Sequence, residues 1–161
     1  EACFANHPGV CVGYRLFAGS RSLAFFPDNE LRQRQHSIRR PPGRSQPHDI
    51  EFARREDSKI GEFVRDADVL IMDAQYDCAE YRKHVGWGHG CVDDVVQLAL
   101  AANVRRLFLF HHAPDHDDAT VTRSTRAARA LVAKQERKLR VDAAREGLKV
   151  SWNGTGPKTR A

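Results

Sequence analysis

The sequence lacks three features that would place it in other classes of protein: a membrane-spanning run, a leader segment and a tight cysteine motif. Its apolar runs stay far below the roughly 18 residues that a transmembrane helix needs. The chain begins with Glu1, its only methionine is Met72, and no charged-then-apolar leader precedes its body. We therefore expect no membrane partner, and we expect that the natural N-terminal half is missing.

Cysteine is sparse and scattered along the chain. The four thiols belong to Cys3, Cys11, Cys78 and Cys91, and no two of them form a C-x-x-C pair. This spacing fits neither a zinc ribbon nor the disulfide framework of a small secreted domain. The sequence therefore predicts buried free thiols and a cytoplasmic protein.

The length and charge indicate one globular domain with a modest basic bias. The chain has 161 residues, of which 41% are hydrophobic, and a net charge of +5. Much of the excess lies in residues 31–48, which we interpret as an Arg/Pro-rich loop. Such a loop could attract an anionic substrate, for example a phosphate ester, or nucleic acid. A solvated variable loop is the simpler interpretation.

The hydrophobic pattern alternates between strand-like and helix-like segments, an order typical of an α/β layer. The predicted elements are a hairpin of Val10–Phe17 and Ser22–Phe26, an amphipathic segment over His48–Asp66, buried strands at Val69–Met72 and Leu107–Phe110, a helix at Val92–Ala102, a long helix from Thr122 to Glu146, and a last strand at Leu148–Trp152. We expect Gly147 to end the long helix, and residues 153–161 to form a frayed tail.

Polar side chains stand where three of the predicted strands end. These are Asp28, Asp73 and His111. In α/β folds, ligands bind beyond the carboxyl ends of the strands. Three polar side chains reaching one edge of the sheet are the strongest functional signal that the residues alone provide.

His111 and Asp28 are candidate metal ligands. A strand holds the backbone rigidly, so an imidazole at its end is well placed to bind a metal, as His111 is after Leu107–Phe110. A core-edge histidine bonded to a neighbouring carbonyl is the alternative. Asp28 could bridge two cations about 3.5–4 Å apart, or it could cap the following turn.

His89 is a candidate proton donor, because the glycines on both sides of it allow a close backbone approach and leave the imidazole partly exposed. A stray histidine in a flexible loop is the alternative, although Trp87 nearby favours an ordered loop. His7 could line the pocket or end a turn, and Asp73 could orient a ligand histidine or merely end its strand. His112 and His116 have i, i+4 spacing, but Pro114 disfavours a helix there.

These motifs, in this order, resemble the C-terminal half of metallo-β-lactamase-fold proteins, in the ribonuclease Z-like and small-phosphodiesterase-like branch. The resemblance covers roughly residues 3–150. Asn6–Gly9, Gly13–Arg15 and Phe26–Glu30 are similar to the segment that leads to the bridging aspartate. Asp73–Tyr76 and Gly86–His89 are similar to the strand and loop that carry the proton-donating histidine. Leu107–His112 is similar to the strand that ends in the last metal ligand.

The resemblance implies one half of an αββα sandwich, a mixed sheet with flanking helices, in a single incomplete domain. It also implies two metal ions, zinc or manganese, and hydrolysis of an ester-like bond. Asp28 would bridge the metals, His111 would bind one of them, and His89 would act as acid or charge stabiliser. His7, Asp73, Trp87 and His112 would support these groups or contact substrate.

The sequence departs from this family pattern in three ways. It has no His-x-His-x-Asp-His motif, no counterpart of a further histidine ligand, and Pro27 where a small or hydroxyl residue is commoner. The isolated chain is therefore expected to bind metal weakly and to lack activity.

The predicted function of the intact protein is metal-dependent hydrolysis of a phosphodiester or similar ester by a metal-bridging hydroxide. The substrate would be a small or nucleotide-like anion, and a homodimer is compatible with the sequence. A non-enzymatic signalling or sensor module of the same fold is the first alternative. A nucleic-acid-binding module ranks last, because the Arg/Pro-rich loop has no aromatic residues for stacking.

Overall fold

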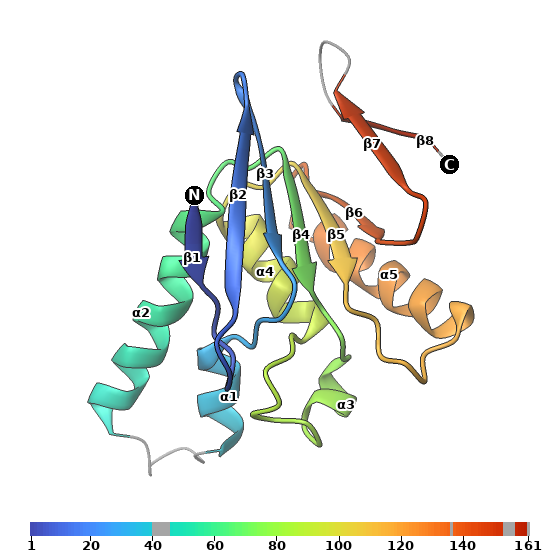
Figure 1. Cartoon of the computed structure of the whole chain (residues 1–161). Helices are drawn as coiled ribbons and strands as arrows, with labels where there is room; N and C mark the ends of the chain where they lie inside the picture. Colours follow the sequence, from blue (N-terminus) through green and yellow to red (C-terminus); the bar gives the residue numbers. More distant parts are fainter. Residues whose placement is uncertain (40–45, 136, 153–156, 161) are drawn as a thin grey trace.

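A computed structural model describes residues 1–39, 46–135, 137–152 and 157–160 (Figure 1). Its main feature is a six-stranded mixed sheet whose spatial order, β1-β2-β3-β4-β5-β6, is also the chain order. The strands are β1 (Ala2–Phe4), β2 (Val12–Ala18), β3 (Arg21–Phe26), β4 (Val69–Asp73), β5 (Arg106–Phe110) and β6 (Arg140–Ala143). The first three strands pair antiparallel, whereas β3 to β6 run parallel. A mixed sheet with flanking helices was predicted and is confirmed.

Five helices occur in the described part of the chain. They are α1 (Arg32–Arg39), α2 (Pro47–Phe63), α3 (Cys78–Tyr81), α4 (Val92–Ala101) and α5 (Asp118–Ala133). Parallel neighbours need crossover connections, and α2, α4 and α5 lie within the crossovers after β3, β4 and β5. None of the described helices is long and apolar enough to cross a membrane.

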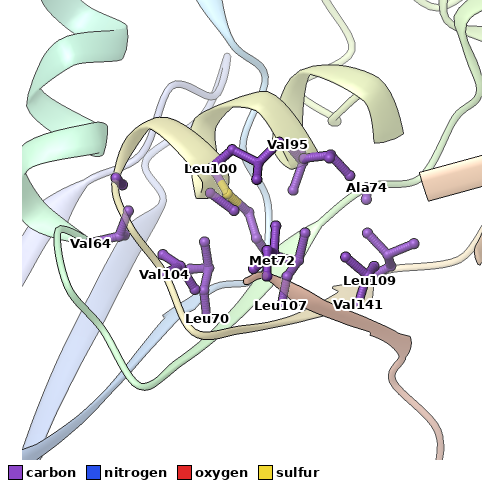
Figure 2. Packing of buried hydrophobic residues seen from close by; sticks show 14 of the residues in the cluster. Val64, Leu70, Met72, Ala74, Val95, Leu100, Val104, Leu107, Leu109 and Val141 are labelled. Atoms are coloured by element: carbon purple, nitrogen blue, oxygen red, sulfur yellow. The ribbon is translucent and has the colours of Figure 1, made fainter. Parts of the chain in front are cut away.

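The main core lies between one face of the sheet and the crossover helices (Figure 2). Alternate residues of each strand point to this face, as the period of two requires. The fully buried strand residues of this core are Ala24, Phe26, Leu70, Met72 and Leu107, and Leu109 is 1% exposed. Val64 of the α2 end, Val95 of α4 and Ala128 of α5 pack against them.

The other face of the sheet is apolar as well, but it is more open. Tyr14 and Leu16 remain 51% and 64% exposed. An apolar groove on this face is lined by Tyr14, Leu16, Leu23, Phe25, Ile71, Phe108, Phe110, Ala144, Arg145, Leu148 and Val150. In layered folds a sheet face of this apolar character packs against a further layer.

The predicted long helix from Thr122 to Glu146 is confirmed as far as Ala133 and is wrong beyond it. Helix α5 begins earlier and ends at Ala133, and Arg140–Ala143 forms β6 instead. The strand is stabilised by parallel pairing with β5 and by Asp142, which accepts hydrogen bonds from Arg106 and Arg129. Gly147 does not end a helix but lies at φ 75° before β7 (Lys149–Trp152).

Residues 31–48 are not a continuous loop, because Arg32–Arg39 forms α1 and α2 begins at Pro47. The carboxylate of Asp57 accepts hydrogen bonds from the backbone N–H groups of Arg32 and Gln33, at 2.7 and 2.9 Å, and so caps the start of α1. The prediction for residues 40–45 lies outside the described residues.

The predicted frayed tail is wrong in part, because Pro157–Arg160 forms strand β8, which pairs antiparallel with β7. The prediction for residues 153–156 and 161 lies outside the described residues. The cysteines are free thiols, as predicted, but only Cys91 is buried, and the other three are partly exposed. Cys3 lies in the edge strand β1, Cys11 just before β2, and Cys78 at the start of the short helix α3, and these positions have less covering structure than the core.

Candidate metal centre

Four potential metal ligands converge at one edge of the sheet: Asp28, Asp73, His89 and His111. Each provides one ligand atom, and these atoms all lie within 4.8 Å of one another. Asp28 and His111 follow β3 and β5, Asp73 ends β4, and His89 lies in the loop before α4. The three strands are parallel neighbours, so their carboxyl ends meet at the same edge (Figure 1).

His111 lies against the Asp28 segment. Its Nδ1 atom is 2.7 Å from Oδ1 of Asp28 and 3.0 Å from the carbonyl oxygen of Pro27. The Nδ1 atom is therefore the His111 nitrogen that faces the other candidate ligands, and it also lies 3.8 Å from Oδ2 of Asp73. His111 has φ 59°, in the left-handed region that side chains other than glycine rarely adopt. The surrounding structure holds this conformation at the end of β5 and turns the imidazole toward Asp28.

Asp73 is the most buried member of the cluster, with no exposed surface. Its carboxylate accepts hydrogen bonds from the backbone N–H groups of Asn29, Gln75 and Gly90, at 3.1–3.2 Å. Burial raises the pKa of this carboxyl, although the hydrogen bond from His89 opposes the rise. Asp73 is therefore held in one orientation from three sides.

His89 contacts Asp73 through its Nδ1 atom, 2.8 Å from Oδ2. This hydrogen bond raises the pKa of the imidazole above its usual value, and burial opposes the effect. The two glycines beside His89 are needed for close approach. A Cβ at Gly90 would lie 2.3 Å from the carbonyl oxygen of Asp73, and one at Gly88 would lie 2.1 Å from the ring of His7.

The other sequence-predicted residues surround the cluster rather than join it. The ring centroid of His7 lies 6.0 Å from that of His89. Trp87 is 61% exposed and stands two residues before His89. His112 directs Nε2 toward the carbonyl oxygen of Ala144, at 3.3 Å, and burial lowers its pKa. His116 pairs with Glu80 at 3.0 Å, so His112 and His116 have different partners.

Sequence reasoning assigned Asp73 a supporting role and did not single out Glu30. Asp73 stands at the end of a parallel strand between those of Asp28 and His111, and that signal was available for grouping it with them. Glu30 carried no signal in the sequence, because its importance comes from contacts with residues more than 50 positions away.

The four side chains have the chemistry of a transition-metal site. Two carboxylates and two imidazoles are the ligand types that zinc and manganese accept in proteins. Asp73 and His89 also have the arrangement of a carboxylate that orients an imidazole through its second nitrogen. The residues present therefore fit a divalent metal ion at this edge.

Comparisons with known proteins agree on the fold. No family model matches the sequence. The metallo-beta-lactamase fold protein YhfI from Bacillus subtilis superposes with a TM-score of 0.60 and 18% identity, over 91% of this chain and 46% of that chain. The chain therefore has the metallo-β-lactamase fold and spans about half the length of YhfI.

Part of the chain is more specifically ribonuclease Z-like in sequence. It is 38% identical to a ribonuclease Z from Picrophilus torridus over 56 residues, which is 35% of this chain and 18% of that protein. It is 38% identical to a ribonuclease Z from Sulfurisphaera tokodaii over 60 residues, which is 37% of this chain and 20% of that protein. The homology is thus partial, covering about a fifth of each relative's length.

Proposed function

We propose that this chain supplies part of the active site of a metal-dependent hydrolase that cleaves a phosphodiester or a similar ester. The convergence of Asp28, Asp73, His89 and His111 within 4.8 Å carries the proposal. Two divalent ions, zinc or manganese, would supply Lewis acidity and a hydroxide nucleophile at neutral pH. The partial likeness to ribonuclease Z supports the choice of a phosphodiester.

The contacts of the side chains support the roles that we propose for them. Asp28 would bridge the metal ions, and His111, whose Nδ1 lies 2.7 Å from Oδ1 of Asp28, would bind one of them. His89 would donate a proton to the leaving group. Its raised pKa keeps more of the imidazole protonated near neutral pH, as an acid requires.

Trp87 and His7 are proposed to contact the substrate. Successive ring contacts link His89 to Trp87. The ring centroid of Tyr76 lies 6.3 Å from that of His89, and the ring of His84 stacks on Tyr76 with a centroid distance of 4.4 Å. The centroid of the Trp87 ring lies 4.7 Å from that of His84. The exposed indole would cover a planar or apolar part of an anionic, nucleotide-like substrate. Trp87→Ala in the natural full-length protein should raise KM more than it lowers kcat, and an unchanged KM would remove Trp87 from the substrate site.

For the chain alone, we propose weak metal binding and no hydrolysis, because the first metal motif of the family is absent from it. The test is metal content after equilibrium dialysis against Zn²⁺ or Mn²⁺, for the wild type and for His111→Ala. His116→Ala is the matched control, since His116 is also partly buried but pairs with Glu80. Equal metal retention in wild type and His111→Ala would refute ligation by His111.

A sensor or signalling role without metal is the second candidate. The 2.7 Å contact between His111 and Asp28 favours it, since the two side chains already satisfy each other as a pair. This candidate predicts no stoichiometric metal in the natural protein and no hydrolysis of bis(4-nitrophenyl) phosphate. Bound metal together with hydrolysis that chelation abolishes would reject it.

A further inference from the structure

Glu30 is a buried carboxylate whose contacts join two parts of the candidate metal centre. It is 2% exposed, and it lies two residues after Asp28. The hydroxyl of Tyr81 donates to Oε1 at 2.5 Å, and Nε2 of Gln35 donates to Oε2 at 3.2 Å. The backbone N–H groups of Gly86 and Gly88 donate to Oε1 and Oε2, at 2.7 and 3.0 Å. A carboxylate buried without a cation is costly unless donors such as these satisfy it.

The two glycines held by Glu30 shape the loop that carries His89. Gly86 and Gly88 have φ values of 89° and 96°, which side chains other than glycine rarely adopt. The N–H groups of these glycines, on either side of Trp87, donate hydrogen bonds to the two oxygens of the Glu30 carboxylate. The backbone of the loop before His89 is therefore held at two points. The loop lies at the same end of the sheet as α1, which follows Glu30 in the chain (Figure 1).

The backbone around Glu30 is fixed at the opposite side. The N–H of Glu30 donates to the carbonyl oxygen of Asn6 at 2.8 Å. The N–H of Asn29 donates to Oδ2 of Asp73 at 3.2 Å, and its side-chain oxygen accepts from the N–H of Asn6 at 2.9 Å. Asp28 is therefore the start of a three-residue segment that contacts Asp73 through its backbone and the His89 loop through Glu30.

We propose that Glu30 is a positioning residue: its carboxylate holds the Gly86–Gly88 loop against the segment that begins at Asp28. It thereby places His89 beside Asp73 and restrains Asp28, the proposed bridging ligand. The assignment of the metal ligands is part of the proposed function, so the metal-affinity part of this inference rests on that proposal. The placement of His89 itself does not depend on any metal. Residues that orient metal ligands typically contribute about 10–100-fold to metal affinity.

The variant Glu30→Gln tests this role with the same side-chain shape. The amide oxygen of the glutamine still accepts a hydrogen bond from one glycine N–H, but its amide nitrogen, a donor, then faces the N–H of the other glycine. One of the two hydrogen bonds to the loop is therefore lost. Asp57→Asn is the matched control. Asp57 is 4% exposed and also accepts hydrogen bonds from neutral donors. These donors are the side-chain amide of Asn6, the backbone N–H of Arg32, and the backbone N–H and side-chain amide of Gln33. Asp57 caps α1 and makes no hydrogen bond to the Gly86–His89 loop among the described residues.

The first measurement uses the metal-free chain. In Glu30→Gln, the amide resonances of Gly86 and Gly88 should move upfield, and the ring Cε1–H resonance of His89 should shift, whereas Asp57→Asn should leave the His89 resonance in place. The second measurement is Zn²⁺ and Mn²⁺ affinity by equilibrium dialysis. Glu30→Gln should bind at least about tenfold more weakly than wild type, and Asp57→Asn should stay within about twofold of it.

An unmoved His89 resonance in Glu30→Gln, or an affinity loss no larger than that of Asp57→Asn, would overturn the proposal. If the wild-type chain binds no metal, the proposed metal binding by the chain alone fails and the His89 resonance alone decides the role of Glu30. If Glu30→Gln does not fold, Tyr81→Phe replaces it. That variant removes one donor to Oε1 and should move the His89 resonance in the same direction by a smaller amount, and no movement would overturn the proposal.

Discussion

The imidazole Nδ1 of His89 lies 2.8 Å from Oδ2 of Asp73, a carboxylate with no exposed surface. Asp73 ends β4 and His89 belongs to a glycine-flanked loop sixteen residues later, so the contact joins a rigid strand to an irregular segment. The N–H groups of Asn29, Gln75 and Gly90 hold the carboxylate from three sides. The orientation of His89 is thus set from the sheet.

Replacing the carboxylate of Asp73 should lower the pKa of His89. In Asp73→Asn the charge that favours the imidazolium is removed, so the pKa of His89 should fall toward its usual value. The measurement is an NMR titration of the His89 Cε1–H resonance in metal-free protein. Asp68→Asn is the control, because Asp68 is also a buried aspartate but pairs with Arg21 and Arg105. An unchanged His89 titration in Asp73→Asn would show that burial, and not this carboxylate, governs the imidazole.

A methyl group at position 90 should disturb the centre. A Cβ at Gly90 would lie 2.3 Å from a backbone oxygen of Asp73, which cannot move without shifting β4. Gly90→Ala should therefore destabilise the chain by about 1–3 kcal/mol in urea unfolding. Gly61→Ala is the control, since Gly61 lies inside α2 and a Cβ there would be 3.6 Å from the side chain of Leu98 in α4, an ordinary contact distance. That substitution should be neutral or stabilising by up to about 1 kcal/mol. Equal effects of the two substitutions would contradict the close approach of Gly90 to Asp73.

The acid stability of the chain should depend on Asp142 of β6. Burial opposes ionisation of this carboxyl, but hydrogen bonds from Arg106 and Arg129 outweigh it and hold its pKa below the usual value. A lowered folded-state pKa contributes stability above the unfolded value of about 3.9, and that contribution is lost as the pH falls through the folded value. Asp142→Asn should thus lower Tm at pH 7, and its Tm should approach that of wild type as the pH falls through the lowered folded-state pKa of Asp142. A constant Tm difference across this range would refute the linkage.

The two faces of the sheet should respond differently to truncation. Leu107 is fully buried against the crossover helices, whereas Leu16 on the other face is 64% exposed. Leu107→Ala should cost about 2–5 kcal/mol of unfolding free energy, because it leaves a cavity in the core. Leu16→Ala should cost less than about 0.5 kcal/mol in this chain. Denaturant unfolding measures both, and comparable losses would mean that another layer covers the Leu16 face in solution.

Local patterning was enough for much of the sheet and for the edge at which the candidate ligands lie. Apolar runs bounded by polar residues indicated β4 and β5, and the short turn around Gly19 indicated the β2–β3 hairpin. These elements are readable because the period of the apolar residues is set by burial on one or both faces. The helix predicted through Arg140–Ala143 failed for the opposite reason. Four residues are too few to establish a period, and β6 forms because β5 offers a free edge and Arg106 and Arg129 bind Asp142.

The amino-acid sequence by itself determined which residues end the parallel strands, because strand length and the polar residue that follows are local properties. Asp28, Asp73 and His111 were identifiable on that basis. Only the tertiary structure decided how these groups meet: that His89 contacts Asp73, that His111 faces the Pro27 carbonyl oxygen, and that Glu30 holds the glycines before His89. Contacts between residues many positions apart depend on the register of the strands and the path of the crossovers, and no local pattern records either.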